Sequence, residues 1–286
     1  MQQIAHAVER VRAAAPLVQC ITNTVVQQVT ANALLACGAS PAMLDHEADA
    51  AQFARIANGI LVNFGTATSH QLLAADAAIA EANALGTPWV LDPVSVGGVD
   101  YRTTRIRAAA AQRPTAVRGN ASEIAALAGH GAGGRGVDAT DEVDAVLPAA
   151  VELSRALASG TGVPGSVIAV SGPVDAIVRT RAEGGADVVR VGGGSDLMPL
   201  VIGTGCSLGA VAAAYLGAAD RTDPDAALWA VAAAHAHFAA AGARAAESAQ
   251  GPGSFAVAFV DALHALAPEE IAAVTVTAEV RSEERS

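Results

Sequence analysis

Residues 201–217 read Val-Ile-Gly-Thr-Gly-Cys-Ser-Leu-Gly-Ala-Val-Ala-Ala-Ala-Tyr-Leu-Gly, a glycine loop followed directly by an alanine-rich run with helical spacing. Glycine at 203 and 205 lets the backbone fold tightly around a ligand. The first N–H groups of the helix have no partner within it, and the helix dipole favours an anion at that end. Cys206 lies in the first turn, where the pKa of a thiol tends to fall. The stretch therefore predicts a site that holds a phosphoryl group beside a side chain able to take a proton.

Taken alone, this pattern has low specificity. A Gly-x-Gly turn before a helix of small residues also serves ordinary close packing. The stretch lacks the Gly-Lys-Ser/Thr of a Walker A loop and the full Gly-x-Gly-x-x-Gly of a dinucleotide-binding first strand. The rest of the chain has to decide between a ligand site and a packing motif.

Composition predicts a globular α/β protein with a closely packed core. Of 286 residues, 52% are hydrophobic, 16% charged and 3% aromatic. The formal net charge of −11 argues against nucleic acid or an anionic membrane as a partner, so an anion such as ATP must be bound by a local device. Three cysteines make neither a disulfide framework nor a Cys-x-x-Cys metal site, which favours a reducing, cytoplasmic setting. The N-terminus has no apolar run of the signal-peptide type, and the uncharged stretch 197–219 is interrupted by proline and glycines, which disfavours a membrane span.

Strand and helix patterns alternate along most of the chain, which predicts a mainly parallel sheet with helices on both faces. The expected strands are 17–26, 40–44, 59–64, 88–94, 115–117 and 166–170, with an antiparallel meander at 175–180 and 188–191. The expected helices are 4–14, a run ending at 35, a start near 45–49, 69–85, 102–112, 122–128 with Ser122 as the cap, 142–158, 206–218, 224–248 and 255–266. Residues 129–141 are expected to form a mobile loop. No repeat or boundary divides the chain, so residues 1–286 are expected to form one domain.

Polar residues gather where the predicted strands end, which is where parallel α/β sheets bind ligands. These positions are Asn63, Asp92, Arg118 with Asn120 and Glu123, Ser171, and the loop of Gly203, Thr204, Gly205 and Cys206. Asp92 and Glu123 could hold Mg²⁺, partly through water. Arg118 can bridge phosphates, and the glycine loop can neutralise charge on the transferred group. The set is typical of a phosphoryl-transfer site.

Each of these residues also has an interpretation without function. Asp92 before Pro93 is typical of a plain strand end, and Arg118 could pair with Glu123 as a structural salt bridge. Cys206 could be a small core residue, as Cys20 and Cys37 are expected to be. His235 and His237, two positions apart on a predicted helix, favour core or surface roles over metal ligation.

Six motifs follow one another along the chain: Thr-Asn-Thr-Val-Val at 22–26, Gly-Ala-Ser-Pro-Ala-Met at 38–43, Leu-Asp-Pro-Val at 91–94, Arg-Gly-Asn-Ala-Ser-Glu-Ile at 118–124, Gly-Thr-Gly-Cys at 203–206 and Gly-Pro-Gly-Ser-Phe at 251–255. In this order they resemble the hydroxyethylthiazole kinase family, which belongs to the ribokinase-like kinases. The resemblance runs from about Pro16 to about Leu266. Each motif is weak alone, and the ordered set is strong.

The resemblance implies a three-layer α/β/α ribokinase-like fold with a mainly parallel central sheet. It also implies ATP-dependent phosphorylation of the primary alcohol of 5-(2-hydroxyethyl)-4-methylthiazole in thiamine salvage, by a homotrimer with sites between neighbouring subunits. Carried over by position, the substrate would contact Met43, Asn23 and the backbone of Gly203. ATP would contact Arg118, Ser171, Asn120, Thr204 and Gly205, with Cys206 at the catalytic base position and Asp92 and Glu123 facing Mg²⁺.

Three features depart from the family pattern. Residues 95–100 read Ser-Val-Gly-Gly-Val-Asp where many members have a Gly-Ala-Gly-Ala-Thr-like run, the frequent threonine is Ser171 here, and 131–136 is unusually rich in glycine. The alternatives are a ribokinase-like kinase for the pyrimidine half of thiamine, a nucleotide-dependent oxidoreductase, and a binding protein without activity. Met43 and Cys206 argue against the first, the missing dinucleotide motif against the second, and the intact Asp92, Glu123 and Cys206 against the third.

Overall fold

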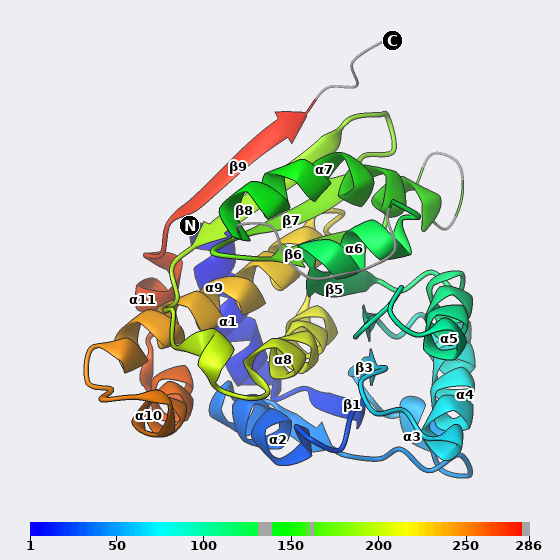
Figure 1. The fold of residues 1–286 in the computed structure, drawn as a ribbon, viewed down its shortest axis with the longest axis horizontal. Helices are drawn as coiled ribbons and strands as arrows, with labels where there is room; N and C mark the ends of the chain where they lie inside the picture. The colour runs from blue at the N-terminus through cyan, green and yellow to red at the C-terminus, as the bar shows by residue number, and fades with distance from the viewer. Residues whose placement is uncertain (131–138, 159, 161–162, 282–286) are drawn as a thin grey trace.

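The protein is built around one twisted sheet, flanked by helices on both faces (Figure 1). The computed structural model describes residues 1–130, 139–158, 160 and 163–281. In this part of the chain the strands are β1 (Leu17–Ile21), β2 (Ser40–Ala42), β3 (Gly59–Asn63), β4 (Trp89–Asp92), β5 (Ala116–Asn120), β6 (Val167–Ser171), β7 (Val174–Thr180), β8 (Ala186–Gly192) and β9 (Val276–Arg281). Their order across the sheet is β2-β1-β3-β4-β5-β6-β7-β8-β9. All pairs from β2 to β6 are parallel, and the pairs from β6 to β9 are antiparallel.

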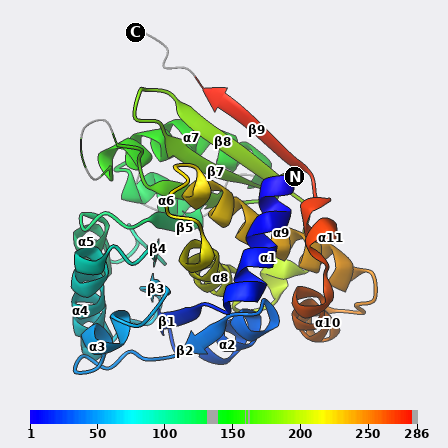
Figure 2. The ribbon, with the colours of Figure 1, turned by 180° about the vertical axis from the view of Figure 1, so that it is seen from behind.

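The helices form two layers around this sheet. They are α1 (Gln2–Ala14), α2 (Gln27–Ala36), α3 (Ala50–Ala54), α4 (Ser69–Leu85), α5 (Asp100–Ala110), α6 (Ala121–Leu127), α7 (Ala139–Ala156), α8 (Thr204–Ala218), α9 (Ala226–Ala246), α10 (Pro252–Ala265) and α11 (Pro268–Ala272). One core joins the sheet to α8 and α9, with α1, α2, α10 and α11 outside them, and the other core lies under α3 to α7. Figure 2 shows α1 crossing over α8 and α9. The expected α/β/α architecture is confirmed.

Small residues bring α8 unusually close to the sheet. A Cβ at Gly59 of β3 would overlap the carbonyl oxygen of Ala213, and one at Gly217 would lie 2.9 Å from the backbone of Asn58. A Cβ at Gly209 would lie 3.1 Å from Leu61. This contact explains why a core with so few aromatic residues packs well. The backbone of α8 lies directly against the backbone at β3, and no space is left there for large side chains. It also holds the N-terminus of α8 at the carboxyl ends of β3 and β4.

The structure corrects several predicted element bounds. Asn120, rather than Ser122, caps α6, because its Oδ1 accepts from the N–H of Glu123 at 2.9 Å and Ser122 already lies within the helix. The helix start predicted near 45–49 is α3, with Asp49 as its N-cap residue, whereas β5 extends three residues beyond the predicted strand. Of the loop expected at 129–141, residues 131–138 lie outside the described residues, and α7 begins at Ala139.

The C-terminal part adds two elements that sequence patterns did not predict. Helix α11 follows Pro268, and β9 then pairs antiparallel with β8 over Ala186 to Val191. Strand β9 is exposed along most of its length and therefore lacks the buried apolar alternation that reveals a strand.

Among the described helices, α9 is the one whose length and hydropathy would allow it to cross a membrane. In the structure, 78% of its apolar stretch is buried inside the protein, where it packs against β6, β7 and β8. Helix α9 is thus a core helix of this fold.

Candidate active site

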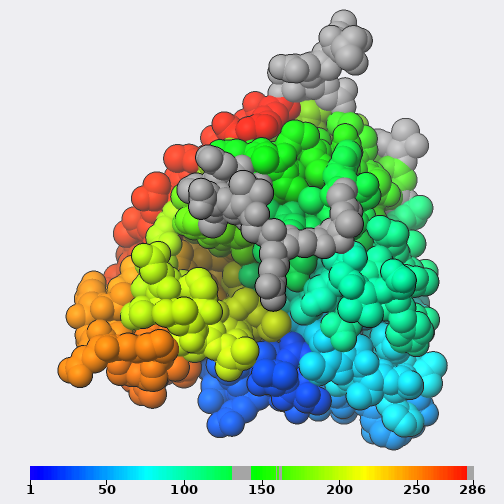
Figure 3. Space-filling model, viewed as in Figure 1, coloured from blue at the N-terminus to red at the C-terminus, as the bar shows by residue number. Residues whose placement is uncertain are grey.

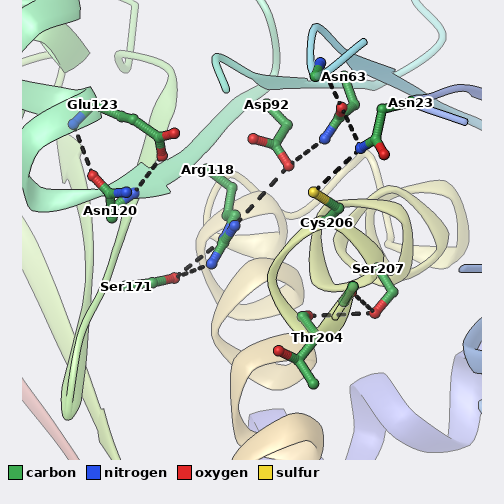
Figure 4. Close-up of polar contacts among 12 residues, drawn as sticks. Asn23, Asn63, Asp92, Arg118, Asn120, Glu123, Ser171, Thr204, Cys206 and Ser207 are labelled. Carbon is green, nitrogen blue, oxygen red and sulfur yellow. Dashed lines mark hydrogen bonds and ion pairs between the residues drawn. The ribbon is translucent and has the colours of Figure 1, made fainter. Parts of the chain in front are cut away.

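The glycine loop before α8 forms one wall of the site (Figure 4). Gly203 is the N-cap residue with φ +92°, a conformation that favours glycine, and a Cβ there would overlap Cγ1 of Val29. The hydroxyl of Thr204 contacts the carbonyl oxygens of Met198 and Val201 at 3.0 and 3.3 Å, so the loop holds its own shape. No side chain caps α8, which leaves its first N–H groups available to an anion.

A chain of amide hydrogen bonds joins the ends of β1, β3 and β4 to the start of α8. Asn23 Nδ2 donates to Asn63 Oδ1 at 3.0 Å and lies 3.4 Å from the Sγ of Cys206. Asn63 Nδ2 donates to Asp92 Oδ2 at 2.7 Å. The parallel register places Asn63 directly beside Asp92. The two asparagines therefore hold a carboxylate and a thiol at fixed positions along one edge of the site.

Asn63 has a role that the sequence did not assign. Its position at a strand end was recognised, but the Asp92 neighbour depends on the register between β3 and β4. A polar residue at the last position of each of two successive strands is the sequence signal from which this pair could have been predicted.

Arg118 connects the carboxylate to the next strand. Its Nε and one terminal nitrogen donate to Ser171 Oγ at 3.1 and 2.9 Å, and its other terminal nitrogen lies 4.0 Å from Asp92 Oδ2. The guanidinium lies over Gly205, where an added Cβ would be 3.0 Å from it. A side chain at 205 would push the arginine away from the helix start. The alternative salt bridge of Arg118 with Glu123 is not formed.

Asp92 is a buried carboxyl group, 1% exposed, and its Oδ1 has no hydrogen-bond partner. Burial raises its pKa to about 7, with a smaller contribution from the charge of Glu123, while Arg118 and Asn63 act in the opposite direction. Leaving a buried oxygen unpaired costs stability, so this atom marks a position where a ligand or ion would find an acceptor.

The pKa of Cys206 is raised, which contradicts the lowered value expected for a thiol at a helix N-terminus. Burial is the larger cause, and the negative charge of Asp92 adds to it, whereas Asn63, Arg118 and Asn23 act in the opposite direction. The thiol is therefore mainly protonated at neutral pH. By contrast, Cys20 and Cys37 are buried core residues as expected, and burial raises their pKa to about 12.

Glu123 and Asn120 shape the far side of the site. They form a capping box, in which Glu123 Oε2 accepts from the N–H of Asn120 at 2.9 Å. Glu123 Oε1 accepts from the N–H of Ser95 at 3.1 Å, and Ser95 has φ +63°. The carboxylate thus orders the loop after β4 as well as α6.

Met43 follows the edge strand β2 and packs half-buried against the core under α8. Its loop is tied down by Gln19, whose Nε2 donates to the carbonyl oxygen of Leu44 at 3.3 Å, and by Gln71, whose Nε2 donates to Asp45 at 2.8 Å. Met43 and Cys206 lie at the same end of the sheet, after β2 and beside a residue that follows β1.

A mainly parallel sheet with polar strand ends facing a glycine-capped helix defines a ribokinase-like kinase. The fold agrees with that of pyridoxal kinase from Staphylococcus aureus in complex with AMP-PCP and pyridoxal, at a TM-score of 0.56 and 15% identity, covering 93% of this chain and 98% of that one. Residues 8–269 match the hydroxyethylthiazole kinase family. The chain belongs to this family, and it is a kinase of thiamine salvage.

Individual relatives agree along nearly their whole length. The hydroxyethylthiazole kinase of Corynebacterium efficiens is 54% identical over 270 residues, covering 94% of this chain and 95% of the relative. That of Serratia proteamaculans is 48% identical over 257 residues, covering 90% of each. The structure of the hydroxyethylthiazole kinase protein from Pyrococcus horikoshii superimposes with a TM-score of 0.83 at 32% identity, covering 98% of this chain and all of that one.

Proposed function

We propose that residues 1–286 form one kinase domain that transfers the terminal phosphoryl group of ATP to the primary alcohol of 5-(2-hydroxyethyl)-4-methylthiazole, in the cytoplasm. The observation that carries this proposal is the continuous polar chain from Cys206 through Asn23, Asn63 and Asp92 to Arg118, set against the N-terminus of α8. A thiol, a carboxylate and a guanidinium held together in this way offer a proton acceptor, a cation ligand and a phosphate ligand within one site.

In this proposal ATP binds across the carboxyl ends of β5 and β6. Arg118 and Ser171 hold phosphate oxygens, and the backbone N–H groups of Thr204 and Gly205 neutralise charge on the transferred group. The Thr204 hydroxyl is occupied by backbone carbonyls, so its backbone is the part that faces the phosphate. Asn120 contributes from the start of α6, where its amide already caps the helix.

The residues present fit a Mg²⁺ ion at Asp92. Its Oδ1 is a buried oxygen without a partner, and carboxylate oxygens are the ligands that Mg²⁺ takes from proteins. Glu123 already accepts two backbone N–H groups, so it fits an ion best through a water molecule. Within the described residues no group of three or more acidic, histidine or cysteine side chains could enclose a metal, which suits an ion held mainly by phosphates and water. When bound, Mg²⁺ would neutralise charge on the phosphates.

Cys206 accepts the alcohol proton late in the transfer. Phosphoryl transfer passes through a loose transition state in most analyses, so little proton removal is needed early. Asn23 donates to Sγ and would stabilise the thiolate. A weak base is sufficient because positioning and charge neutralisation lower most of the barrier.

The acceptor alcohol would lie between Asn23, Gly203 and Met43, and a neighbouring subunit of a homotrimer would complete its pocket. The apolar side chains of Val25, Leu200 and Ile202 flank the glycine loop and are exposed. Figure 3 shows the yellow region that contains this loop beside the blue N-terminal part of the chain, and a Cβ at Gly203 would meet Val26 and Val29. Exposed apolar residues beside a site favour a subunit contact.

Light scattering should give a trimer, and an active monomer at working concentration would contradict the assembly.

The activity is tested by measuring ATP consumption with and without the thiazole alcohol, in the presence and absence of Mg²⁺, followed by mass analysis of the product. The expected result is a phosphorylated thiazole that forms only when all three are present. A folded protein that makes no such product, or that phosphorylates the hydroxymethylpyrimidine in its place, would overturn the proposal.

The raised pKa of Cys206 predicts how turnover depends on pH. Because the thiolate fraction grows as pH rises toward that pKa, turnover should increase across the alkaline range. Cys206→Ser should lack this increase, since a serine hydroxyl does not ionise there. Cys206→Asp should preserve or raise the rate and also lack it. The measurement is kcat against pH at saturating ATP for the three proteins, and identical profiles would exclude Cys206 as the proton acceptor.

A further inference from the structure

A buried histidine and a partly exposed aspartate form a hydrogen-bonded pair beside the proposed ATP site. His235 lies in the middle of α9 and is 0% exposed, and its Nδ1 is 2.6 Å from Oδ2 of Asp175 near the start of β7. The carboxylate is an acceptor, which assigns the proton to Nδ1. The other ring nitrogen, Nε2, is buried and has no hydrogen-bond partner.

Stability alone does not account for this histidine. An unpaired buried nitrogen is unfavourable, and an apolar residue at 235 would remove it. The second histidine of the helix, His237, is equally buried but uses both nitrogens, with Nδ1 2.8 Å from the hydroxyl of Tyr215 and Nε2 2.8 Å from the carbonyl oxygen of Leu263. His237 has the contacts of a structural core histidine, and His235 does not.

The other carboxylate oxygen of Asp175 connects the pair to the turn between β6 and β7. Asp175 Oδ1 accepts from the N–H of Gly172 at 2.8 Å, across the turn that joins β6 to β7. Gly172 follows Ser171, the residue whose hydroxyl takes two hydrogen bonds from Arg118. A continuous path therefore runs from α9 through Asp175 and the turn to Ser171 and Arg118.

We propose that His235 is a positioning residue for ATP, which acts by fixing Asp175 and, through it, the turn that presents Ser171 and Arg118 to the phosphates. The inference rests on the proposed function, because it requires Arg118 and Ser171 to bind ATP. Without the Nδ1 bond, the Asp175 side chain, 17% exposed, turns toward water and releases Gly172. The turn then samples several conformations, and ATP binding has to select one of them.

The test compares His235→Leu and His235→Asn with the matched control His237→Leu on the same helix. His235→Leu should raise the KM for ATP about tenfold, the loss of one hydrogen bond to a charged group, and leave the KM for the thiazole alcohol unchanged. His235→Asn should restore the parent KM, because its amide nitrogen takes the place of Nδ1. His237→Leu should lower the melting temperature without changing the KM for ATP.

Two further variants keep the outcome decisive. Asp175→Ala removes the carboxylate that accepts from both His235 and Gly172 and should raise the KM for ATP as much as His235→Leu does. Because Asp175 is partly exposed, this variant tests the proposal even if His235→Leu folds poorly. Arg118→Ala should weaken ATP binding in any case and so tests the proposed function. If Arg118→Ala raises the KM for ATP while Asp175→Ala and His235→Leu do not, the positioning role is wrong and the ATP site stands. If the parent binds no ATP, both fail.

Discussion

The Asp92→Ala variant is expected to turn over about 10²–10³-fold more slowly than the parent, a larger loss than Cys206→Ser causes. Asp92 is the buried carboxylate with a free oxygen at the strand end, and no neighbouring acid can replace it because Glu123 is held by two backbone N–H groups. Metal and phosphate charge must be neutralised throughout the transfer, whereas the alcohol proton leaves late. A positioned base contributes about 10²–10⁴-fold, and a mainly protonated thiol belongs at or below the low end.

The comparison needs kcat for Asp92→Ala, Glu123→Ala and Cys206→Ser at saturating substrates, after each variant has been shown to melt near the parent. The kcat of Glu123→Ala is also expected to be lower than that of Cys206→Ser. Part of this loss of turnover comes from the missing α6 cap, which should also lower the melting temperature of the variant. If Cys206→Ser abolishes turnover while Asp92→Ala is nearly neutral, the two roles are assigned wrongly.

Much of the site could be predicted because it lies at strand ends. In a parallel sheet, residues that follow consecutive strands converge at one edge, so Asp92, Arg118 and Ser171 were expected together before any contact was known. The structure brings them within hydrogen-bond or ion-pair distance. The Gly-Thr-Gly turn is likewise local, since a left-handed Gly203 before a helix depends only on neighbouring residues.

What could not be predicted depends on distant packing. The direction of the Cys206 pKa shift follows from burial and from Asp92, which is 114 positions away in the chain, and not from the helix turn that contains the thiol. The His235–Asp175 pair joins a core helix to a hairpin, and the largely apolar, alanine-rich sequence around 235 gives no sign of a polar partner. Strand β9 is held in the sheet by its pairing with β8. Its side chains are mostly exposed, so its sequence has no alternation of buried and exposed residues from which a strand could be predicted.

The largest expected effect on stability is that of Gly203→Ala, which should lower the free energy of unfolding by about 3 kcal/mol. A side chain at φ +92° costs about 1–3 kcal/mol, and forcing a methyl group into the space of Val29 costs about 1–3 kcal/mol more. The melting temperature should fall by roughly 6–12 °C, measured by calorimetry. Turnover should fall as well, because the overlap with Val29 shifts the loop and, with it, the N-terminus of α8 that faces Arg118 and Asp92.

Gly253→Ala is the matched control, since this glycine lies in α10 with nothing within 4 Å of an added Cβ, and it should leave stability unchanged or slightly raised. The two costs at Gly203 can also be separated. Val29 is half-buried on α2, so Val29→Ala alone should be mild, and combined with Gly203→Ala it should recover the part of the loss that comes from overlap. The part that persists in the double variant measures the backbone strain of the left-handed turn. If Gly203→Ala has the same melting temperature as Gly253→Ala, the turn does not require glycine. The close packing of the loop against α2 then does not determine the position of the site.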